Sequence, residues 1–171
     1  YSIKESSAKM QTLSELRVTN SSRSDTGIYT CSATSDIGAD EAVIKLIVQG
    51  IPDAPSNVTV MNITSRSFSL HWEVTDNGNS HITGSIVQYQ THSADTEWNG
   101  QTSQLIVSSA ETVATLRGLT PITSYYVRII AENSLGKSKP SEVLEVSTEE
   151  EEGSTIEDIP FSQEVPALEI Q

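Results

Sequence analysis

The chain has 171 residues, of which 36% are apolar, and 10 Lys and Arg against 23 Asp and Glu give a net charge of −13. This length allows one or two domains. The acidic balance argues against direct binding to nucleic acid or to an anionic membrane, since both require a basic surface. No apolar run approaches the roughly 18 residues that span a bilayer, and no signal sequence opens the chain. We therefore expect a globular, β-rich protein, and interpret the start at Tyr1 as that of a fragment.

Residues 1–49 are predicted to be the C-terminal part of an immunoglobulin-type sandwich, from strand D or E to strand G. Tyr29 stands two residues before the single cysteine, Cys31, on an alternating run that begins at Asp25. This spacing is typical of the corner between strands E and F, where the tyrosine hydroxyl bonds to the backbone and the cysteine faces the core. Asp25, Tyr29 and Cys31 are therefore candidate structural residues.

The strands that should cover this half-sandwich are missing from the sequence. Neither a cysteine of strand B nor a tryptophan of strand C precedes Cys31, so we expect its disulfide partner upstream of the fragment. The alternative is an unpaired, buried cysteine that packs as a small hydrophobe. Leu16 and Val18 are expected to point inward on strand E, and residues 42–48 to form strand G. Without a disulfide worth about 2–5 kcal/mol, this half should be marginally stable alone.

A short linker, residues 50–55, follows and contains Pro52 and Pro55. Each proline fixes its own φ and biases the residue before it towards extended conformations. We therefore expect a semi-rigid elbow between two β-domains.

Residues 53–148 are predicted to form a complete antiparallel β-sandwich. Phe68, Leu70 and Trp72 alternate with polar residues and share one face of the second strand, and Val87 and Tyr89 share the inner face of the third. The remaining strands are expected at residues 57–60, around Trp98, at 105–107, around Leu116, at 125–131 and at 143–146.

These residues resemble a fibronectin type III domain. The resemblance rests on Trp72, on the corner formed by Leu119, Pro121, Thr123 and Tyr125, and on the turn at residues 133–136. It implies structural roles for Trp72 and Tyr125. More narrowly, residues 64–67, 78–84 and 86–89 resemble the first fibronectin repeat of the Down syndrome cell adhesion molecule (Dscam) family, and residues 1–49 would then match that family's ninth immunoglobulin domain. Ser85 replaces the aromatic residue usual in that family, so we expect a small void or a looser strand there.

Three sequons provide candidate N-glycosylation sites at Asn20, Asn57 and Asn62. All three asparagines are expected in a loop or on the outward face of an edge strand, where a glycan can be carried. The alternative is that they are ordinary polar surface residues.

No catalytic or metal-binding constellation is found. His71, His81 and His92 lack the spacing of metal-ligating or catalytic motifs and are expected to be surface residues. The turn at residues 76–80 resembles a calcium loop only faintly, because it lacks the carboxylates and the closing glutamate. We expect no catalytic residue, no metal and no cofactor.

Two further regions of the chain have a distinctive composition. Ile130 shares the outer face of its strand with Tyr126 and Arg128, which suggests either a small protein contact or scattered surface apolarity. Residues 149–171 hold eight acidic residues and no basic one. Their like charges predict a disordered tail or linker.

The family resemblance implies a non-enzymatic segment on the extracellular side of the plasma membrane. It would act as a stalk or protein-interaction module of a cell-adhesion and axon-guidance receptor, with homophilic recognition carried by other domains. Cell-surface proteins are the expected partners, and neither nucleic acid nor direct membrane insertion is expected. The alternative is an intracellular scaffolding or elastic segment of a giant muscle protein, since these proteins mix the same two domain types.

Overall fold

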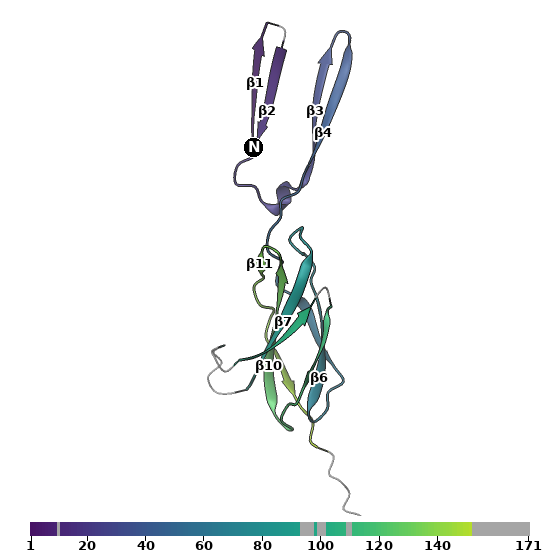
Figure 1. The fold of residues 1–171 in the computed structure, drawn as a ribbon, viewed down its shortest axis with the longest axis vertical. Helices are drawn as coiled ribbons and strands as arrows, with labels where there is room; N and C mark the ends of the chain where they lie inside the picture. The colour runs from purple at the N-terminus through teal and green to yellow at the C-terminus, as the bar shows by residue number, and fades with distance from the viewer. Residues whose placement is uncertain (10, 93–97, 99–101, 109–110, 152–171) are drawn as a thin grey trace, which may run out of the picture.

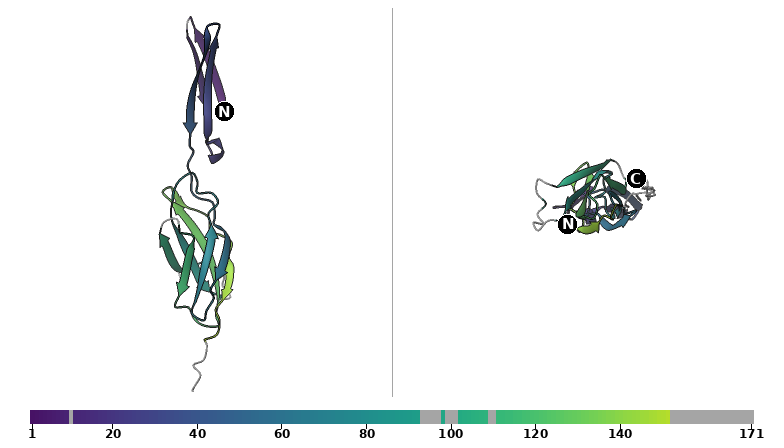
Figure 2. Two further views of the ribbon diagram at one scale, coloured as in Figure 1. Left: turned by 90° about the vertical axis from the view of Figure 1, so that its right-hand side faces the viewer. Right: turned by 90° about the horizontal axis from the view of Figure 1, so that it is seen from below.

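The computed structural model describes residues 1–9, 11–92, 98, 102–108 and 111–151, and within them the chain is all-β with antiparallel pairing. The first part consists of two hairpins that lie at one end of an elongated molecule, and the second part is a sandwich at the other end (Figures 1 and 2). None of the described residues belongs to a helix long and apolar enough to cross a bilayer.

The two N-terminal hairpins are built from neighbouring strands. Strand β1 (Ser2–Ala8) pairs with β2 (Gln11–Arg17), and β3 (Gly27–Ser35) pairs with β4 (Gly38–Leu46). A single 3-10 turn, η1 (Arg23–Asp25), lies between the hairpins. The side chain of Arg23, the first residue of η1, reaches the sandwich.

The hairpins leave their apolar side chains open to solvent. No described residue among positions 1–49 is buried, and Ile3, Leu13 and Ile44 are 70%, 64% and 63% exposed. This agrees with the expectation of apolar faces that lack covering strands. Val18 is half-buried, but the strand expected at this residue is wrong, because β2 ends at Arg17. Leu16 does lie on β2, but it is 44% exposed because no described residue covers it.

The second part is a sandwich of two sheets. One sheet has the order β5 (Ser56–Met61), β6 (Ser67–Glu73), β9 (Val113–Arg117). The other has the order β11 (Gly136–Lys137), β10 (Ser124–Asn133), β7 (Ile82–Thr91), β8 (Ser103–Ser108), and β12 (Leu144–Ser147) also pairs with β10.

The core of the sandwich follows from the alternation in the sequence. Phe68, Leu70 and Trp72 of β6 are fully buried, and Val87 of β7 faces them from the other sheet. Val127, like its neighbours on β10, packs into the same cluster. Burial of these side chains supplies about 1.5–3 kcal/mol each, which makes this part the stable body of the chain.

Two details differ from the expectations or refine them. Trp98 lies outside any strand, so the strand expected around it is wrong at that residue, and residues 93–97 and 99–101 lie outside the described part. Ser85 is 2% exposed, and its hydroxyl has no hydrogen-bond partner among the described residues. A buried polar group without a partner costs free energy. The looser strand expected at Ser85 stays a prediction, and the unpaired hydroxyl would be its cause.

Candidate functional site

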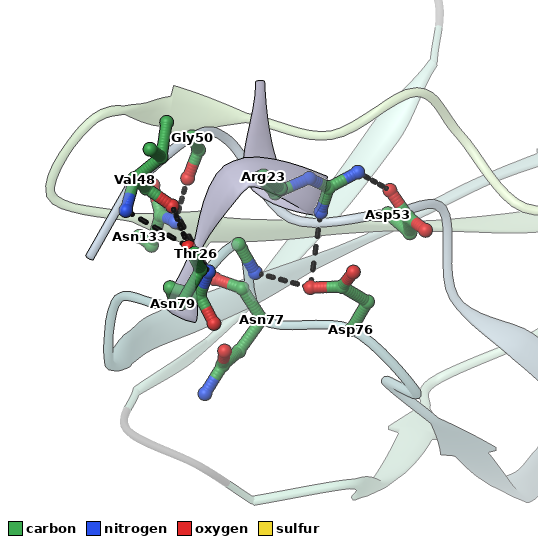
Figure 3. Close-up of polar contacts among 10 residues, drawn as sticks. Arg23, Thr26, Val48, Gly50, Asp53, Asp76, Asn77, Asn79 and Asn133 are labelled. Carbon is green, nitrogen blue, oxygen red and sulfur yellow. Dashed lines mark hydrogen bonds and ion pairs between the residues drawn. The ribbon is translucent and has the colours of Figure 1, made fainter. Parts of the chain in front are cut away.

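A cluster of polar contacts lies where the two parts meet. Residues of η1 and of the segment 48–53 contact two loops of the sandwich, residues 76–79 between β6 and β7 and the end of β10 at Asn133 (Figure 3). We call this set of contacts the joint. Pro52 and Pro55 are both buried at its border, so the linker is packed as well as conformationally restricted.

Arg23 connects the first part to two carboxylates of the second. Its Nη2 donates to Asp53 Oδ1, and its Nη1 lies 3.0 Å from Asp76 Oδ1 (Figure 3). The hydrogen bond to Asp53 is the main cause that raises the pKa of Arg23 above its ordinary value. All three side chains are partly exposed, so the charge attraction is screened and its main effect is on orientation.

Asn79 provides a second connection through its amide. Its Nδ2 donates to Val48 O at 2.9 Å and to Thr26 Oγ1 at 3.1 Å, and its own backbone oxygen accepts from Gln49 Nε2 at 2.9 Å. Its φ of 54° lies in the left-handed region, which asparagine tolerates better than most residues. Asn79 therefore contacts both Thr26, just before β3, and Val48, just after β4.

The backbones of Gly50 and Gly78 touch directly. Gly50 N donates to Gly78 O at 2.9 Å, and Asp53 N donates to Asp76 O at 3.0 Å. Gly78 has a φ of +71°, and a Cβ at this position would lie 2.2 Å from Gly50 O. Only glycine fits here, because any side chain would push the two segments apart.

Asn133 fixes the same place from the sandwich side. It is 3% exposed, and its Nδ2 donates to Gly50 O at 2.7 Å and to Asn77 O at 3.0 Å. Its Oδ1 accepts from Leu135 N at 2.9 Å and Gly136 N at 3.2 Å. The amide thus satisfies four backbone groups that would otherwise lack partners.

Replacing Asn133 by alanine should destabilise the sandwich by about 1–3 kcal/mol, because buried backbone groups lose their partners. Asn133→Asp keeps the two accepted bonds and loses the donated ones, so we expect it to disturb the joint more than the β10–β11 turn. Urea unfolding followed by tryptophan fluorescence measures this, since Trp72 and Trp98 both lie in the second part. Asn77→Ala is the control, because Asn77 contributes a backbone oxygen and is exposed; equal loss in both variants would contradict the prediction.

The tyrosine corner expected in the first part has the expected bond. Tyr29 donates its hydroxyl to Asp25 O at 2.8 Å. The carboxylate of Asp25 accepts from Ser22 N at 2.8 Å, which is the main cause that lowers the pKa of Asp25. The Tyr1 hydroxyl also donates to Asp25, and this bond raises the pKa of Tyr1. Asp25 therefore links the first hairpin to the corner beside η1.

The corresponding corner of the sandwich lies at its far end. The Tyr125 hydroxyl accepts from Thr120 N at 2.9 Å, and its ring centroid lies 6.3 Å from that of Phe68. Trp72 is fully buried, and its Nε1 has no partner among the described residues. Both residues thus occupy core positions, as the resemblance implies.

The three sequon asparagines are exposed and share a backbone feature. Asn20, Asn57 and Asn62 have φ values of 53°, 51° and 51°. Asn57 lies at the irregular part of edge strand β5, where the pairing register with β6 shifts, and Asn62 follows the end of that strand. Asn57 Nδ2 donates to Glu73 Oε2 at 2.7 Å, a contact that a glycan would replace. Occupancy of these sites stays a prediction.

Cys31 lies on β3 and is exposed and unbonded. It neighbours Ala42 of β4 in the hairpin and has no covering strand among the described residues. The upstream disulfide partner therefore also stays a prediction.

The three histidines do not come together. His92 lies 3.3 Å from Glu145 and stacks near Tyr126, whereas His71 and His81 lie elsewhere on β6 and before β7. Within the described residues no group of three or more potential ligands could hold a metal ion. The turn that resembled a calcium loop uses its Asp76 carboxylate differently, because Oδ1 accepts from Gly78 N at 2.7 Å and faces Arg23.

The outer face of β10 is less open than expected. Arg128 lies over the Trp98 ring, with 4.1 Å between its guanidinium carbon and the ring centroid, and its Nε donates to Gln88 Oε1 at 2.7 Å. Ile130 is half-buried. Desolvation at this position lowers the pKa of Arg128.

Sequence reasoning missed most of the joint. Arg23 was not singled out, and Asn79 and Asn133 were recognised only as parts of turns, because the partners of these three side chains lie 30, 31 and 83 positions away along the chain. The turn at residues 76–79 offered the one available signal, since a glycine between two asparagines indicates a required left-handed backbone.

The chain matches two domain families in order. The Immunoglobulin I-set domain matches residues 2–48, and the Fibronectin type III domain matches residues 53–147. Relatives include Cell adhesion molecule Dscam1 of Drosophila melanogaster, 34% identical over 88% of this chain, and Cell adhesion molecule DSCAML1 of Gallus gallus, 37% identical over 78% of it. The chain spans only 7% and 6% of these relatives.

Two solved structures are also similar. Domains A168-A170 of titin match with a TM-score of 0.52 and 35% identity, over 76% of this chain and 43% of that one. A fibronectin type III domain of human contactin 1 matches with a TM-score of 0.52 and 28% identity, over 64% of this chain and 89% of that one.

Proposed function

Because the chain belongs to the fibronectin type III domain family and carries an immunoglobulin-type segment before that domain, we propose that it is a non-enzymatic spacer of an extracellular cell-adhesion receptor. Its role is to hold neighbouring domains at a fixed angle. Its partners are cell-surface proteins, and homophilic recognition between cells belongs to other domains of the receptor.

The joint is the observation that carries this proposal. A flexible connection would need no contacts between the two parts, whereas here an arginine, two asparagine amides and a backbone-to-backbone bond connect them. Each contact is individually modest, about 0.5–1.5 kcal/mol for a neutral hydrogen bond. Together they restrict the angle between the parts, which is what a spacer requires.

The cell-adhesion part of the proposal draws on the relatives. Dscam1 and DSCAML1 are named as cell adhesion molecules, and the similarity extends across both parts of the chain. The exposed sequon asparagines are consistent with an extracellular location, where glycans are added. An antiparallel sandwich presents strand faces, edges and end loops, and such surfaces are suited to binding and spacing.

The likeness to titin domains supports a second candidate function, an intracellular elastic or scaffolding segment. The order of domain types and a rigid joint would suit that role equally. The two candidates differ in the chemistry of Cys31 and of the sequons, because disulfides and N-glycans form only in the secretory route.

Peptide mass spectrometry of the protein from its native tissue separates them. After glycosidase treatment in heavy-oxygen water, we expect Asn57 or Asn62 to carry the label that marks a former glycan, and Cys31 to appear in a disulfide-linked peptide. Asn79 and Asn133, which lie outside any sequon, are the internal controls. Unmodified Asn20, Asn57 and Asn62 together with a reduced Cys31 would contradict the extracellular proposal and favour the second candidate.

A further inference from the structure

Strand β8 forms an open edge of the larger sheet. It pairs with β7 along its whole length, from Gly84 opposite Ser108 to Tyr89 opposite Ser103. Within the described part of the chain, no strand pairs with its other side. The backbone N–H and C=O groups on that side are therefore a template for another strand.

The other edges carry features that discourage such pairing, and β8 does not. Strand β5 has a register shift and the sequon residue Asn57, β9 ends in Arg117, and β12 contains Glu145 within four residues. Strand β8 reads Ser-Gln-Leu-Ile-Val-Ser, without charge, proline or glycine, and its register with β7 is unbroken. Charges, bulges and short strands are the usual protection of edges, so β8 is an unprotected one.

A row of isoleucines runs across the sheet and ends at this edge. Ile130 of β10 lies opposite Ile86 of β7, which lies opposite Ile106 of β8. Ile86 is 8% exposed because it has an isoleucine on each side, whereas Ile106 is 73% exposed. An apolar residue on an added strand, placed opposite Ile106, would continue the row and cover its exposed end.

We propose that β8 pairs with β8 of a second copy of this chain, antiparallel and about a two-fold axis at Ile106. In this register Ile106 faces the Ile106 of the other copy, Leu105 faces Val107, and Gln104 faces Ser108. The outer face then gains an isoleucine pair and the inner face two leucine–valine pairs related by the axis. The sequence of β8 is thus complementary to itself, which is what a two-fold interface requires.

The neighbouring two-fold registers do not have this property. Side chains directly opposite each other must lie on the same face, so the axis passes through a residue. An axis at Val107 would place Ile106 opposite Ser108, and the other neighbouring option is an axis at Leu105. That register places Gln104 opposite Ile106 and Ser103 opposite Val107, which pairs polar with apolar residues on both faces. The isoleucine-centred register is therefore favoured.

Charge predicts how this dimer responds to salt. Strand β8 contributes no charged side chain, while each copy carries a net charge of −13 and Glu111 lines the hollow between β8 and β9. The two copies repel each other outside the contact, and salt screens this repulsion. Dimerisation should strengthen as ionic strength rises, unlike that of an interface built on ion pairs.

Sedimentation analysis of the 171-residue chain tests the proposal. We expect a concentration-dependent dimer whose dissociation constant rises at least tenfold in Ile106→Lys, because two lysines would face each other at the axis. Ile122→Lys is the matched control, since Ile122 is 76% exposed in the same domain and lies in the turn before β10, outside every strand described. A monomer at all concentrations, or a dimer weakened equally by both changes, would overturn the proposal.

Cysteine cross-linking tests the register independently, in a Cys31→Ser background that removes the exposed native thiol. Ile106→Cys should form a disulfide-linked dimer under mild oxidation. Gln104→Cys should not, because its own counterpart would lie four residues along the strand, about 13 Å away. A mixture of Gln104→Cys and Ser108→Cys chains should cross-link again. Equal cross-linking of all single variants, or of none, would overturn the proposal. Association driven by the exposed hairpins of the first part would give such a result, because it does not fix the register of β8.

Discussion

Gly78→Ala is expected to open the joint, because the new Cβ would lie 2.2 Å from Gly50 O and backbone atoms must move apart. This movement removes the bond from Gly50 N to Gly78 O and weakens the bond from Asn133 Nδ2 to Gly50 O. We expect a wider distribution of angles between the two parts, seen in small-angle scattering as a broader spread of maximum dimensions. The sandwich should also lose about 1–2 kcal/mol from the left-handed backbone strain.

The chain contains a close control for this experiment. Gly118 has a φ of +70°, almost the same as the +71° of Gly78, but no atom lies within 4 Å of the place where its Cβ would be. Gly118→Ala therefore carries the same backbone strain without the collision. Equal scattering profiles for the two variants would mean that the Gly50–Gly78 contact does not restrict the angle, and the spacer proposal would lose its main support.

The two parts of the chain are expected to differ strongly in hydrogen exchange. Strands β1 to β4 have no buried residue among those described, whereas the core side chains of β6, β7 and β10 are fully buried. Strands open locally where few apolar contacts hold them. Amides of β3 and β4 should therefore exchange at least about a hundredfold faster than those of β6 and β10, since each factor of ten corresponds to about 1.4 kcal/mol of opening free energy.

This comparison is internal, because all strands belong to one chain under one set of conditions. Mass spectrometry of peptic peptides from the 171-residue chain measures it directly. Equal protection in β3 and β6 would contradict the interpretation of residues 1–49 as an uncovered half-sandwich. It would also mean that the first part is stabilised by contacts other than those described, such as association of its apolar faces with a second copy.

Residues 1–49 are attached to the sandwich at one end and exposed at the other. The joint depends on η1 and on the ends of β3 and β4, where Thr26 Oγ1 accepts from Val48 N at 2.9 Å. This base of the hairpins is held to the sandwich, while their distant ends are exposed.

The sequence by itself determined the fold class, the positions of most strands of the sandwich and the two tyrosine corners. These features depend on local spacing: alternate residues of a strand share a face, so Phe68, Leu70 and Trp72 had to be buried together. The same holds for Tyr29 and Tyr125, whose hydroxyls bond four and five residues upstream. The strand expected at Trp98 failed because one aromatic residue without neighbours of clear alternation carries little information about local structure.

Only the tertiary structure decided how the two parts meet and which edge stays open. Arg23, Asn79 and Asn133 are polar residues in turns, and their roles depend on partners from other segments that no local pattern reveals. Likewise, the row that joins Ile130, Ile86 and Ile106 exists only once the register of three strands is fixed. Periodicity determines which face a side chain occupies, whereas the fold determines which side chain lies opposite it.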